Sequence, residues 1–254
     1  MTKLSVNVNK IATLRNSRGG DAPNLSDFVQ RICSFGVGGI TIHPRADQRH
    51  ITRKDVTDVT KTVNAFNETH SVKSATELNF EGDLRDEFIH MVLDHKPTQC
   101  TLVPVTHGEI TSNHGWNVEK NAFILAPVIE KIKAEGIRVS LFMDVLNFKS
   151  IELAAGIGAD RIEIYTEPYA DAFKTGSYDK ALSDIRETAD AITDAGMTVN
   201  AGHDLTTANL IPLLKEVPSI SEVSIGHQLI CDALEMGIEA AVRGYLEATQ
   251  TPLS

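Results

Sequence analysis

Short runs of apolar, mostly β-branched residues alternate along the chain with longer segments in which apolar residues recur every three or four positions. Runs of four to six residues bounded by glycine or polar residues indicate strands that are buried on both faces. Eight runs fit this description, and helical segments separate them. The predicted strands are residues 4–8, 39–43, 77–81, 100–104, 138–142, 161–165, 198–202 and 222–226.

The segments between the strands predict helices. Ser26 is the expected N-cap of the helix in SDFVQRICSFG, and Thr52 with Asp55 forms a start that resembles a capping box. Further helices are predicted for residues 83–95, 118–135, 147–155, 178–195, 206–216 and 228–248. Two long loops remain, 105–117 and 166–179, and loops of this length in a compact domain often belong to binding sites.

Strictly alternating strands and helices of this number predict a (β/α)8 TIM barrel. The alternative is an open, doubly wound sheet, which normally carries a GxGxxG fingerprint after its first strand. The first strand here runs instead into NVNKIATLRNSRGG. No linker or change of composition divides the 254 residues, so we expect one catalytic domain over residues 1–254.

Composition narrows the possible partners and locations. The net charge of −10 argues against a nucleic-acid partner, which usually requires a basic surface. No stretch reaches about 18 apolar residues, and MTKLSVNVNK lacks the apolar run of a signal peptide, so we expect a soluble, cytoplasmic protein without a membrane partner. Cys33, Cys100 and Cys231 lie far apart without a CxxC pair, and we expect buried free thiols.

The carboxyl ends of the predicted strands carry polar residues, and chemistry in TIM barrels takes place at those ends. The residues found there are Asn7, Asn9, Lys10, His43, Arg45, Glu81, Asp144, Glu163, Tyr165, Asn200, His203, Gly226 and His227. Imidazoles and carboxylates exchange protons near neutral pH. The three histidines and Glu81 therefore predict an acid–base site at one rim of the barrel.

Two sets of donors predict phosphate binding. The stretches NAGHDLTT and SIGHQLI follow the last two strands, where barrels bind phosphate with backbone N–H groups and a helix N-terminus. A second set is cationic, and arginine forks match phosphate oxygens, although surface ion pairs are the alternative. This set consists of Arg15, Arg18, Arg45, Arg49 and His50. We therefore expect two phosphorylated ligands, or one with a phosphate at each end.

Other chemistries remain open at this point. Five residues on separate strands are of metal-ligand type, without a spacing signature: His43, Glu81, Asp144, His203 and His227. A metal-dependent sugar-phosphate aldolase or epimerase is therefore one alternative, and a non-catalytic barrel that only binds a sugar phosphate is another. Lys10 could form a Schiff base with a carbonyl substrate, although a lysine beside phosphate donors is more often a charge partner.

The stretches NVNKIATLRNSRGG, GITIHPRADQRHI, LNFEG, KPTQCTLVP, VNAGH and SIGH occur in this order and resemble pyridoxine 5′-phosphate synthases along essentially the whole chain. The resemblance implies a TIM barrel with additional helices, assembled as a homo-octamer and needing no metal or organic cofactor. It also implies condensation of 1-deoxy-D-xylulose 5-phosphate with 3-amino-2-oxopropyl phosphate to give pyridoxine 5′-phosphate, phosphate and water.

The resemblance further assigns roles to residues that match the family's motifs. His43 and Glu81 match the catalytic bases, and His203 matches the catalytic acid. The residues expected to contact the aminoketone phosphate are Asn7, Arg18, Gly226 and His227. Those expected to contact the deoxyxylulose phosphate are Arg45, His50 and Thr111.

Three expected substrate-binding positions depart from the better-known pattern of this family. Asn9-Lys10 stands where Asp-His is usual, and Asp204 stands where Gly follows the catalytic histidine. Asn9 lacks the carboxylate and Lys10 adds a fixed charge, so contacts with the deoxyxylulose phosphate are expected to be rearranged. Asp204 adds a negative charge near a phosphate site, where a backbone N–H contact would be retained.

The implied reaction passes through enol and imine intermediates that water would destroy, so a closing loop is expected over the site. The predicted lid is the loop 105–117, with Gly108 and Gly115 as hinges.

Overall fold

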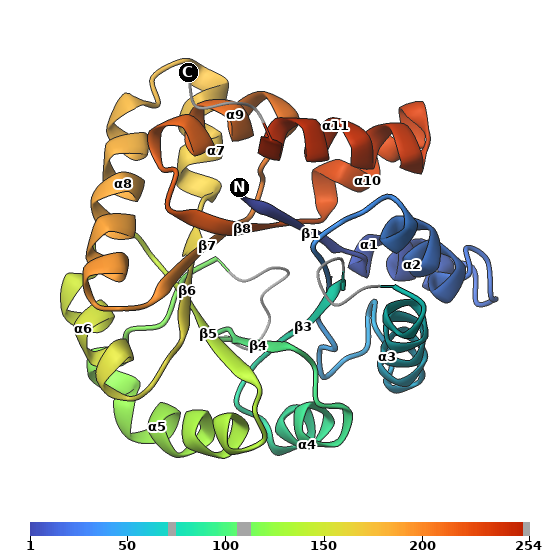
Figure 1. The fold of residues 1–254 in the computed structure, drawn as a ribbon, viewed down its shortest axis with the longest axis horizontal. Coiled ribbons are helices and arrows are strands. Elements are labelled where there is room, and N and C mark those ends of the chain that lie inside the picture. The colour runs from blue at the N-terminus through green and yellow to red at the C-terminus, as the bar shows by residue number, and fades with distance from the viewer. Residues whose placement is uncertain (71–74, 106–112, 251–254) are drawn as a thin grey trace.

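The computed structural model describes residues 1–70, 75–105 and 113–250, and its strands form one closed barrel surrounded by helices (Figure 1). Every strand is parallel to its neighbours, and β8 pairs with β1, which excludes an open sheet. The strands are β1 (Lys3–Asn7), β2 (Gly39–Ile42), β3 (Glu77–Gly82), β4 (Gln99–Leu102), β5 (Arg138–Met143), β6 (Arg161–Tyr165), β7 (Thr198–Gly202) and β8 (Ile220–Ile225). The prediction of a (β/α)8 barrel is confirmed.

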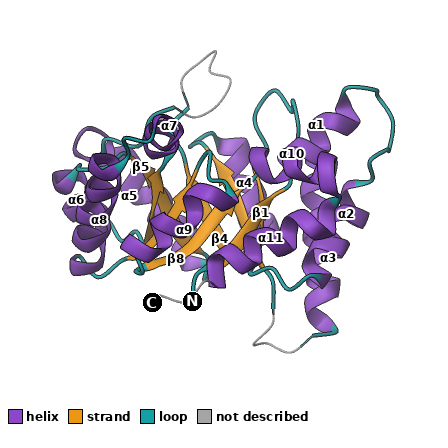
Figure 2. Ribbon diagram, turned by 90° about the horizontal axis from the view of Figure 1, so that it is seen from above, coloured by secondary structure: helices purple, strands orange, loops and turns teal. Residues whose placement is uncertain are grey.

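Eleven helices occur in the described ranges, and they cover the outside of the strands (Figure 2). They are α1 (Asn9–Asn16), α2 (Leu25–Ser34), α3 (Arg53–Glu68), α4 (Asp86–His95), α5 (Val118–Ala134), α6 (Phe148–Gly156), α7 (Glu167–Thr175), α8 (Asp179–Asp194), α9 (Thr207–Glu216), α10 (His227–Met236) and α11 (Ile238–Gln250). Two helices follow each of β1, β6 and β8, which confirms the expected additional helices.

The strands largely alternate between an apolar and a polar face. Residues that face the helices, such as Val6, Ile40 and Ile162, are apolar and fully buried. The buried residues of the opposite, inward face are mostly polar: Ser5, Thr41, Asn79, Gln99, Thr101, Ser140, Arg161, Glu163, Asn200, Glu222 and Ser224. The prediction that both strand faces are buried is confirmed, but the inner face is hydrophilic.

Hydrogen bonds between inward-facing side chains hold the barrel interior together. Ser5 bonds with Thr41 at 2.8 Å across β1 and β2. Deeper in the barrel, Arg161 on β6 donates to Gln99 on β4 at 3.0 Å and to Glu222 on β8 at 3.4 Å. Since these three strands are not neighbours, the Arg161 side chain crosses the interior and connects opposite walls of the barrel.

The start of α3 agrees with the prediction from the sequence, whereas the start of α2 differs from it. The capping box of α3 is confirmed, because Thr52 Oγ1 accepts from the Asp55 N–H and the Asp55 carboxylate accepts from the Thr52 N–H. The prediction of Ser26 as the N-cap of α2 is wrong. Asn24 is the N-cap, and its Oδ1 accepts from the Asp27 N–H at 3.1 Å, so the helix begins two residues earlier than predicted.

Some helices that begin directly after strands were not predicted from the sequence. Residues 9–16, expected as loop, form α1, which buries Ile11 and Ala12. Most of the expected loop 166–179 forms α7, which ends at Gly176 with a φ of +76°. The single helix predicted for residues 228–248 is divided at Gly237, whose φ of +86° lies in the left-handed region that favours glycine.

The thiols differ from one another in burial. Cys33 and Cys100 are buried and free, as predicted, whereas Cys231 is free but only half-buried, and its Sγ lies 3.8 Å from His227 Nε2. Within the described ranges, no helix has the length and apolar character needed to cross a membrane.

The Arg161–Glu222 pair generates a prediction about stability. In Glu222→Ala, the Arg161 guanidinium remains buried without its carboxylate, so the free energy of unfolding should fall by about 3–5 kcal/mol. Denaturant unfolding monitored by circular dichroism measures this loss. Glu239→Ala removes the partner of Arg243 in an exposed pair on α11 and should cost at most about 1 kcal/mol. Equal losses in the two variants would contradict the assignment.

Candidate active site

A cavity of about 510 Å³ lies at the carboxyl ends of the strands. It is lined by most of the residues that the sequence analysis assigned to the site: Asn7, Asn9, Lys10, His43, Arg45, His50, Glu81, His203, Asp204, Gly226 and His227. Arg18 is exposed beyond α1 and does not line this cavity, and Thr111 lies outside the described residues. The structure therefore brings together eleven of the predicted site residues in the cavity lining, and the individual role of each stays a prediction.

The two proposed bases lie side by side. His43 follows the last residue of β2, Glu81 lies on β3, and His43 Nδ1 is 3.8 Å from Glu81 Oε2. Their side chains are only 9% and 12% exposed. His43 lines the cavity, and its Nε2 is buried without a hydrogen-bond partner among the described residues.

Two asparagines from the end of β1 and the start of α1 hold this pair. Asn7 Nδ2 donates to Glu81 Oε2 at 3.3 Å, and Asn7 Oδ1 accepts from the Asn9 backbone N–H at 3.0 Å. Asn9 Oδ1 accepts from the His43 backbone N–H, also at 3.0 Å. The amides of the first strand are therefore part of the site, although in this structure both bind protein groups.

Burial adjusts the proton affinities of these groups. Burial raises the pKa of Glu81 to about 7, which places the change of charge within the physiological range. Burial, with the positive field of nearby groups including Arg45, lowers the pKa of His43 well below its usual range. The imidazole is thus neutral at neutral pH and able to accept a proton, as a general base requires.

Glu163 on β6 also lines the cavity, and the sequence analysis assigned no role to it. Its side chain is buried, and Oε2 has no hydrogen-bond partner among the described residues. Burial, together with the charges of Glu81 and Glu222, raises the pKa of Glu163 well above its usual range. The signal in the sequence was a carboxylate in the middle of the apolar strand RIEIY.

The absence of a side chain at Gly202 on β7 leaves room for the Glu163 carboxylate. A Cβ atom at this position would lie 2.6 Å from Glu163 Oε1, closer than such atoms approach in proteins. The reason for glycine in the VNAGH stretch is therefore the close approach of the Glu163 carboxylate, which a side chain at 202 would displace, because the φ of Gly202 is not in the left-handed region.

His203 lies opposite the Glu81–His43 pair in the cavity lining and packs against aromatic rings. Its ring centroid is 5.2 Å from that of Phe142 and 5.3 Å from that of Tyr165. Burial lowers the pKa of His203, and the Asp204 carboxylate opposes this shift. Asp204 therefore favours the protonated imidazole, the form that can donate a proton.

The backbone explains why an aspartate is tolerated after this histidine. His203 and Asp204 have φ values of +86° and +56°, in the left-handed region that glycine adopts freely and that aspartate adopts more readily than most residues. Thr166 Oγ1 donates to the His203 carbonyl at 2.7 Å and fixes the turn. Asp204 can thus replace glycine here without a change of backbone conformation.

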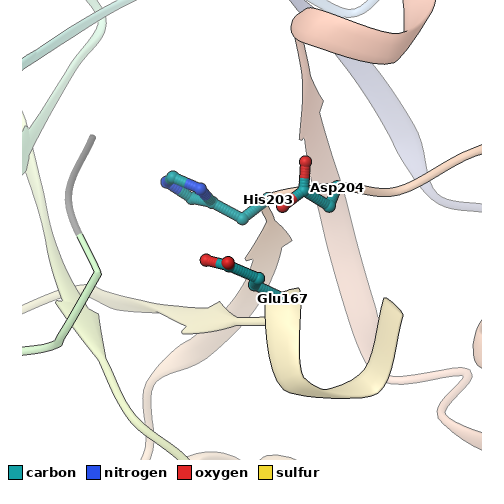
Figure 3. A group of neighbouring side chains, drawn as sticks. All are labelled: Glu167, His203 and Asp204. Carbon is teal, nitrogen blue, oxygen red and sulfur yellow. The ribbon is translucent and has the colours of Figure 1, made fainter. Parts of the chain in front are cut away.

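Glu167, His203 and Asp204 gather at the rim of the cavity and form the group drawn in Figure 3. Each offers one atom of metal-ligand type, and these atoms lie within 4.8 Å of one another. Burial and then the charges of Asp204 and Asp171 raise the pKa of Glu167, whose carboxylate also accepts from the Tyr165 hydroxyl. Of the five ligand-type residues considered from the sequence, His203 is the one that belongs to this group within the described ranges.

Only some residues of the cationic set predicted from the sequence line the cavity. Arg45 and Arg49 line the cavity, and the field of Arg45 and Lys10 adds to burial in lowering the pKa of His50 to about 4. Arg15 is not part of the cavity lining. Its guanidinium is paired with Asp55 of α3, with Nη2 at 2.7 Å from Oδ2, so Arg15 forms an ion pair as in the alternative interpretation, although this pair is largely buried and does not lie on the surface.

The start of α10 forms another part of the cavity wall, next to the end of β1. Gly226 is its N-cap, and His227 and Gln228 are its first residues. A Cβ at Gly226 would lie 3.0 Å from Asn7 Cβ, so glycine permits β8 and β1 to approach here. The unpaired N–H groups and the dipole of a helix N-terminus favour anions such as phosphate.

The predicted lid is only partly described. Gly108 lies outside the described residues. Gly115 donates its backbone N–H to Asp144 Oδ2 at 3.1 Å, and a Cβ at position 115 would lie 2.3 Å from the Asp144 nitrogen. Close packing against β5 is therefore one reason for glycine at this position.

The fold and the cavity together define a class of protein. Proton-transfer groups with shifted pKa values lie at the carboxyl end of a TIM barrel, between a cationic side and a helix N-terminus. This arrangement is that of an acid–base enzyme acting on small phosphorylated molecules.

The chain belongs to the family described as pyridoxal phosphate biosynthesis protein PdxJ, whose family model matches residues 4–251. A pyridoxine 5′-phosphate synthase of Christiangramia forsetii is 46% identical to it, covering 97% of this chain and 99% of the relative. One of Parabacteroides distasonis is also 46% identical, covering 96% of this chain and 98% of the relative.

Solved structures of lower identity show the same fold. A tryptophan synthase α-subunit from Pyrococcus furiosus superposes with a TM-score of 0.59 at 13% identity, covering 98% of this chain and 99% of that one. An orotidine 5′-monophosphate decarboxylase from Methanocaldococcus jannaschii has the same TM-score at 10% identity, covering 97% and 98%.

The raised pKa of Glu81 predicts a pH-dependent gain in stability for Glu81→Gln. The folded state holds this proton up to about pH 7, whereas the unfolded chain releases it near its ordinary value of 4.5. The wild type therefore loses stability as the pH rises from 4.5 to 7. Glutamine does not titrate, so the variant should unfold at a higher temperature than wild type at pH 8.

Differential scanning calorimetry at pH 5 and pH 8 measures this effect. The difference between Glu81→Gln and wild type should be larger at pH 8. Glu152→Gln on α6 is the matched control, because its side chain is 73% exposed, and it should show no such dependence. A difference between Glu81→Gln and wild type that is the same at both pH values would contradict the raised pKa.

Proposed function

We propose that this chain is a pyridoxine 5′-phosphate synthase, an enzyme of vitamin B6 synthesis. It condenses 1-deoxy-D-xylulose 5-phosphate with 3-amino-2-oxopropyl phosphate and releases pyridoxine 5′-phosphate, inorganic phosphate and water. The observation that carries the proposal is the contact of His43 with Glu81, 3.8 Å apart, in a cavity that His203 also lines. Relatives that are 46% identical over nearly the whole chain bear this name.

Two anion sites in the cavity suit the two phosphorylated substrates. The N-terminus of α10, at Gly226 and His227, would bind the phosphate of the aminoketone. Arg45 and His50, with Lys10 beside them, would bind the phosphate of the deoxyxylulose. Holding both ends so that the reacting carbons meet can supply up to about 7–11 kcal/mol of the barrier reduction.

The proton transfers are assigned from the charge states of the groups. Glu81 and the neutral His43 would remove protons from the condensing carbons, and His203 would protonate a departing oxygen. Burial lowers the pKa of His203, Asp204 opposes this shift only in part, and a bound phosphate dianion would oppose it further and favour the protonated imidazole. Burial and the charges of Glu81 and Glu222 favour the protonated form of Glu163, and that form would donate a hydrogen bond to a substrate.

Several finer properties are part of the proposal on the strength of the family resemblance. They are a single catalytic domain over residues 1–254, a homo-octamer, a cytoplasmic location, and activity without a metal or organic cofactor. The loop 105–117 is proposed as the lid that excludes water during the reaction.

Incubation of the purified protein with both substrates tests the function. Wild type should form pyridoxine 5′-phosphate, detected by its absorbance and by mass spectrometry, whereas a barrel that only binds sugar phosphates would not. Glu81→Gln retains the size and the hydrogen-bonding capacity of the side chain but cannot accept the proton. It should bind both substrates and lose at least about 100-fold in kcat. Full activity in this variant would remove Glu81 from the mechanism.

A metal-dependent aldolase or epimerase is the second candidate, because Glu167, His203 and Asp204 could together hold a metal ion. Removal of metal distinguishes this candidate from the pyridoxine 5′-phosphate synthase. We expect the rate of pyridoxine 5′-phosphate formation to be unchanged after exhaustive treatment with EDTA and desalting. Loss of activity that one divalent ion restores would support the metal-dependent alternative.

A further inference from the structure

The end of β2 presents a break in the hydrogen bonding of the barrel. The Val8 N–H donates to the Thr41 carbonyl, as in a regular parallel ladder. The next bond of the ladder would run from the His43 N–H to the Val8 carbonyl. That carbonyl instead accepts from Ile11 and Ala12, because α1 begins directly after the strand.

The side chain of Asn9 replaces the missing ladder bond. Its Oδ1 accepts from the His43 N–H at 3.0 Å, in a region where Asn9 and His43 are 9% and 7% exposed. A buried N–H without a partner is costly, so this bond determines where the backbone of His43 lies.

Asn9 also acts on the second base. Its backbone N–H donates to Asn7 Oδ1, which fixes the orientation of the Asn7 amide and directs Nδ2 to Glu81 Oε2. Glu81 Oε2 in turn lies 3.8 Å from His43 Nδ1. The contacts therefore form a closed circuit that begins and ends at Asn9.

We propose that Asn9 is a positioning residue that sets the distance between Glu81 and His43, in addition to any contact it makes with substrate. This inference rests on the proposed function, since it concerns the bases of that reaction. This positioning role can be filled by asparagine as well as by the aspartate that is usual at position 9. Asparagine accepts the same N–H without adding a carboxylate to a cavity that already contains Glu81 and Glu163.

Kinetics distinguish positioning from substrate contact. In Asn9→Ala, kcat should fall by about tenfold to 100-fold while the KM values for both substrates change little. A residue that only binds the deoxyxylulose phosphate would raise the KM for that substrate at nearly constant kcat, and this result would overturn the proposal. Asn121→Ala on α5, outside the cavity, is the matched control and should behave as wild type.

Asn9→Asp provides a rescue with a distinct signature. Its carboxylate can still accept from His43, so kcat should recover relative to Asn9→Ala. The added negative charge favours protonation of both bases, so the acid limb of the kcat profile should move to higher pH. A profile identical to wild type, together with no recovery of kcat, would contradict the positioning role.

Hydrogen exchange measures the bond without relying on turnover. The His43 amide should exchange about tenfold faster or more in Asn9→Ala than in wild type, and its protection should return in Asn9→Asp. Unchanged exchange in Asn9→Ala would overturn the proposal. If wild type forms no pyridoxine 5′-phosphate, the proposed function fails, and this measurement still decides whether Asn9 holds the His43 backbone. Should Asn9→Ala not fold, Asn9→Ser, whose hydroxyl is too short to reach His43, takes its place in both assays.

Discussion

The hydrophilic interior of the barrel is the constraint on which the rest of the structure depends. A polar group removed from water is costly without a hydrogen-bond partner, and most of the inward-facing side chains find partners on other strands. Arg161 connects Gln99 and Glu222 across the interior, and the same kind of contact continues upward to Asn7 and Glu81 at the rim. The bases of the site are thus the uppermost members of a network that also holds the strands together.

The additional helices contribute to the site as directly as the strands do. α1, α7 and α10 each begin within two residues of a strand end, and each supplies side chains to the cavity lining. α1 supplies Lys10, α7 supplies Glu167, and α10 supplies His227 with its N-terminal N–H groups. A helix that starts this close to a strand takes over backbone partners from the sheet, as at the Val8 carbonyl, and side chains such as Asn9 have to compensate.

The sequence was sufficient for the strands because their apolar, outward-facing residues leave a strong periodic signal. β6 and β7 were predicted with the bounds that the structure shows, and the cavity residues of those strands followed from their carboxyl ends. Short helices such as α1 were missed because their apolar content is small and NKIATLRN resembles loop. The partners of single side chains were also out of reach, because Arg15 pairs with Asp55, which lies 40 residues away.

Gly202 has a consequence for how this sequence can change over time. Its missing side chain leaves the volume that the Glu163 carboxylate occupies, with Oε1 2.6 Å from where a Cβ would stand. Substitutions at the two positions are therefore coupled. A larger residue at 202 would displace the Glu163 carboxylate from its place in the cavity wall, so a change at 202 is expected to accompany a change in the position or length of the side chain at 163.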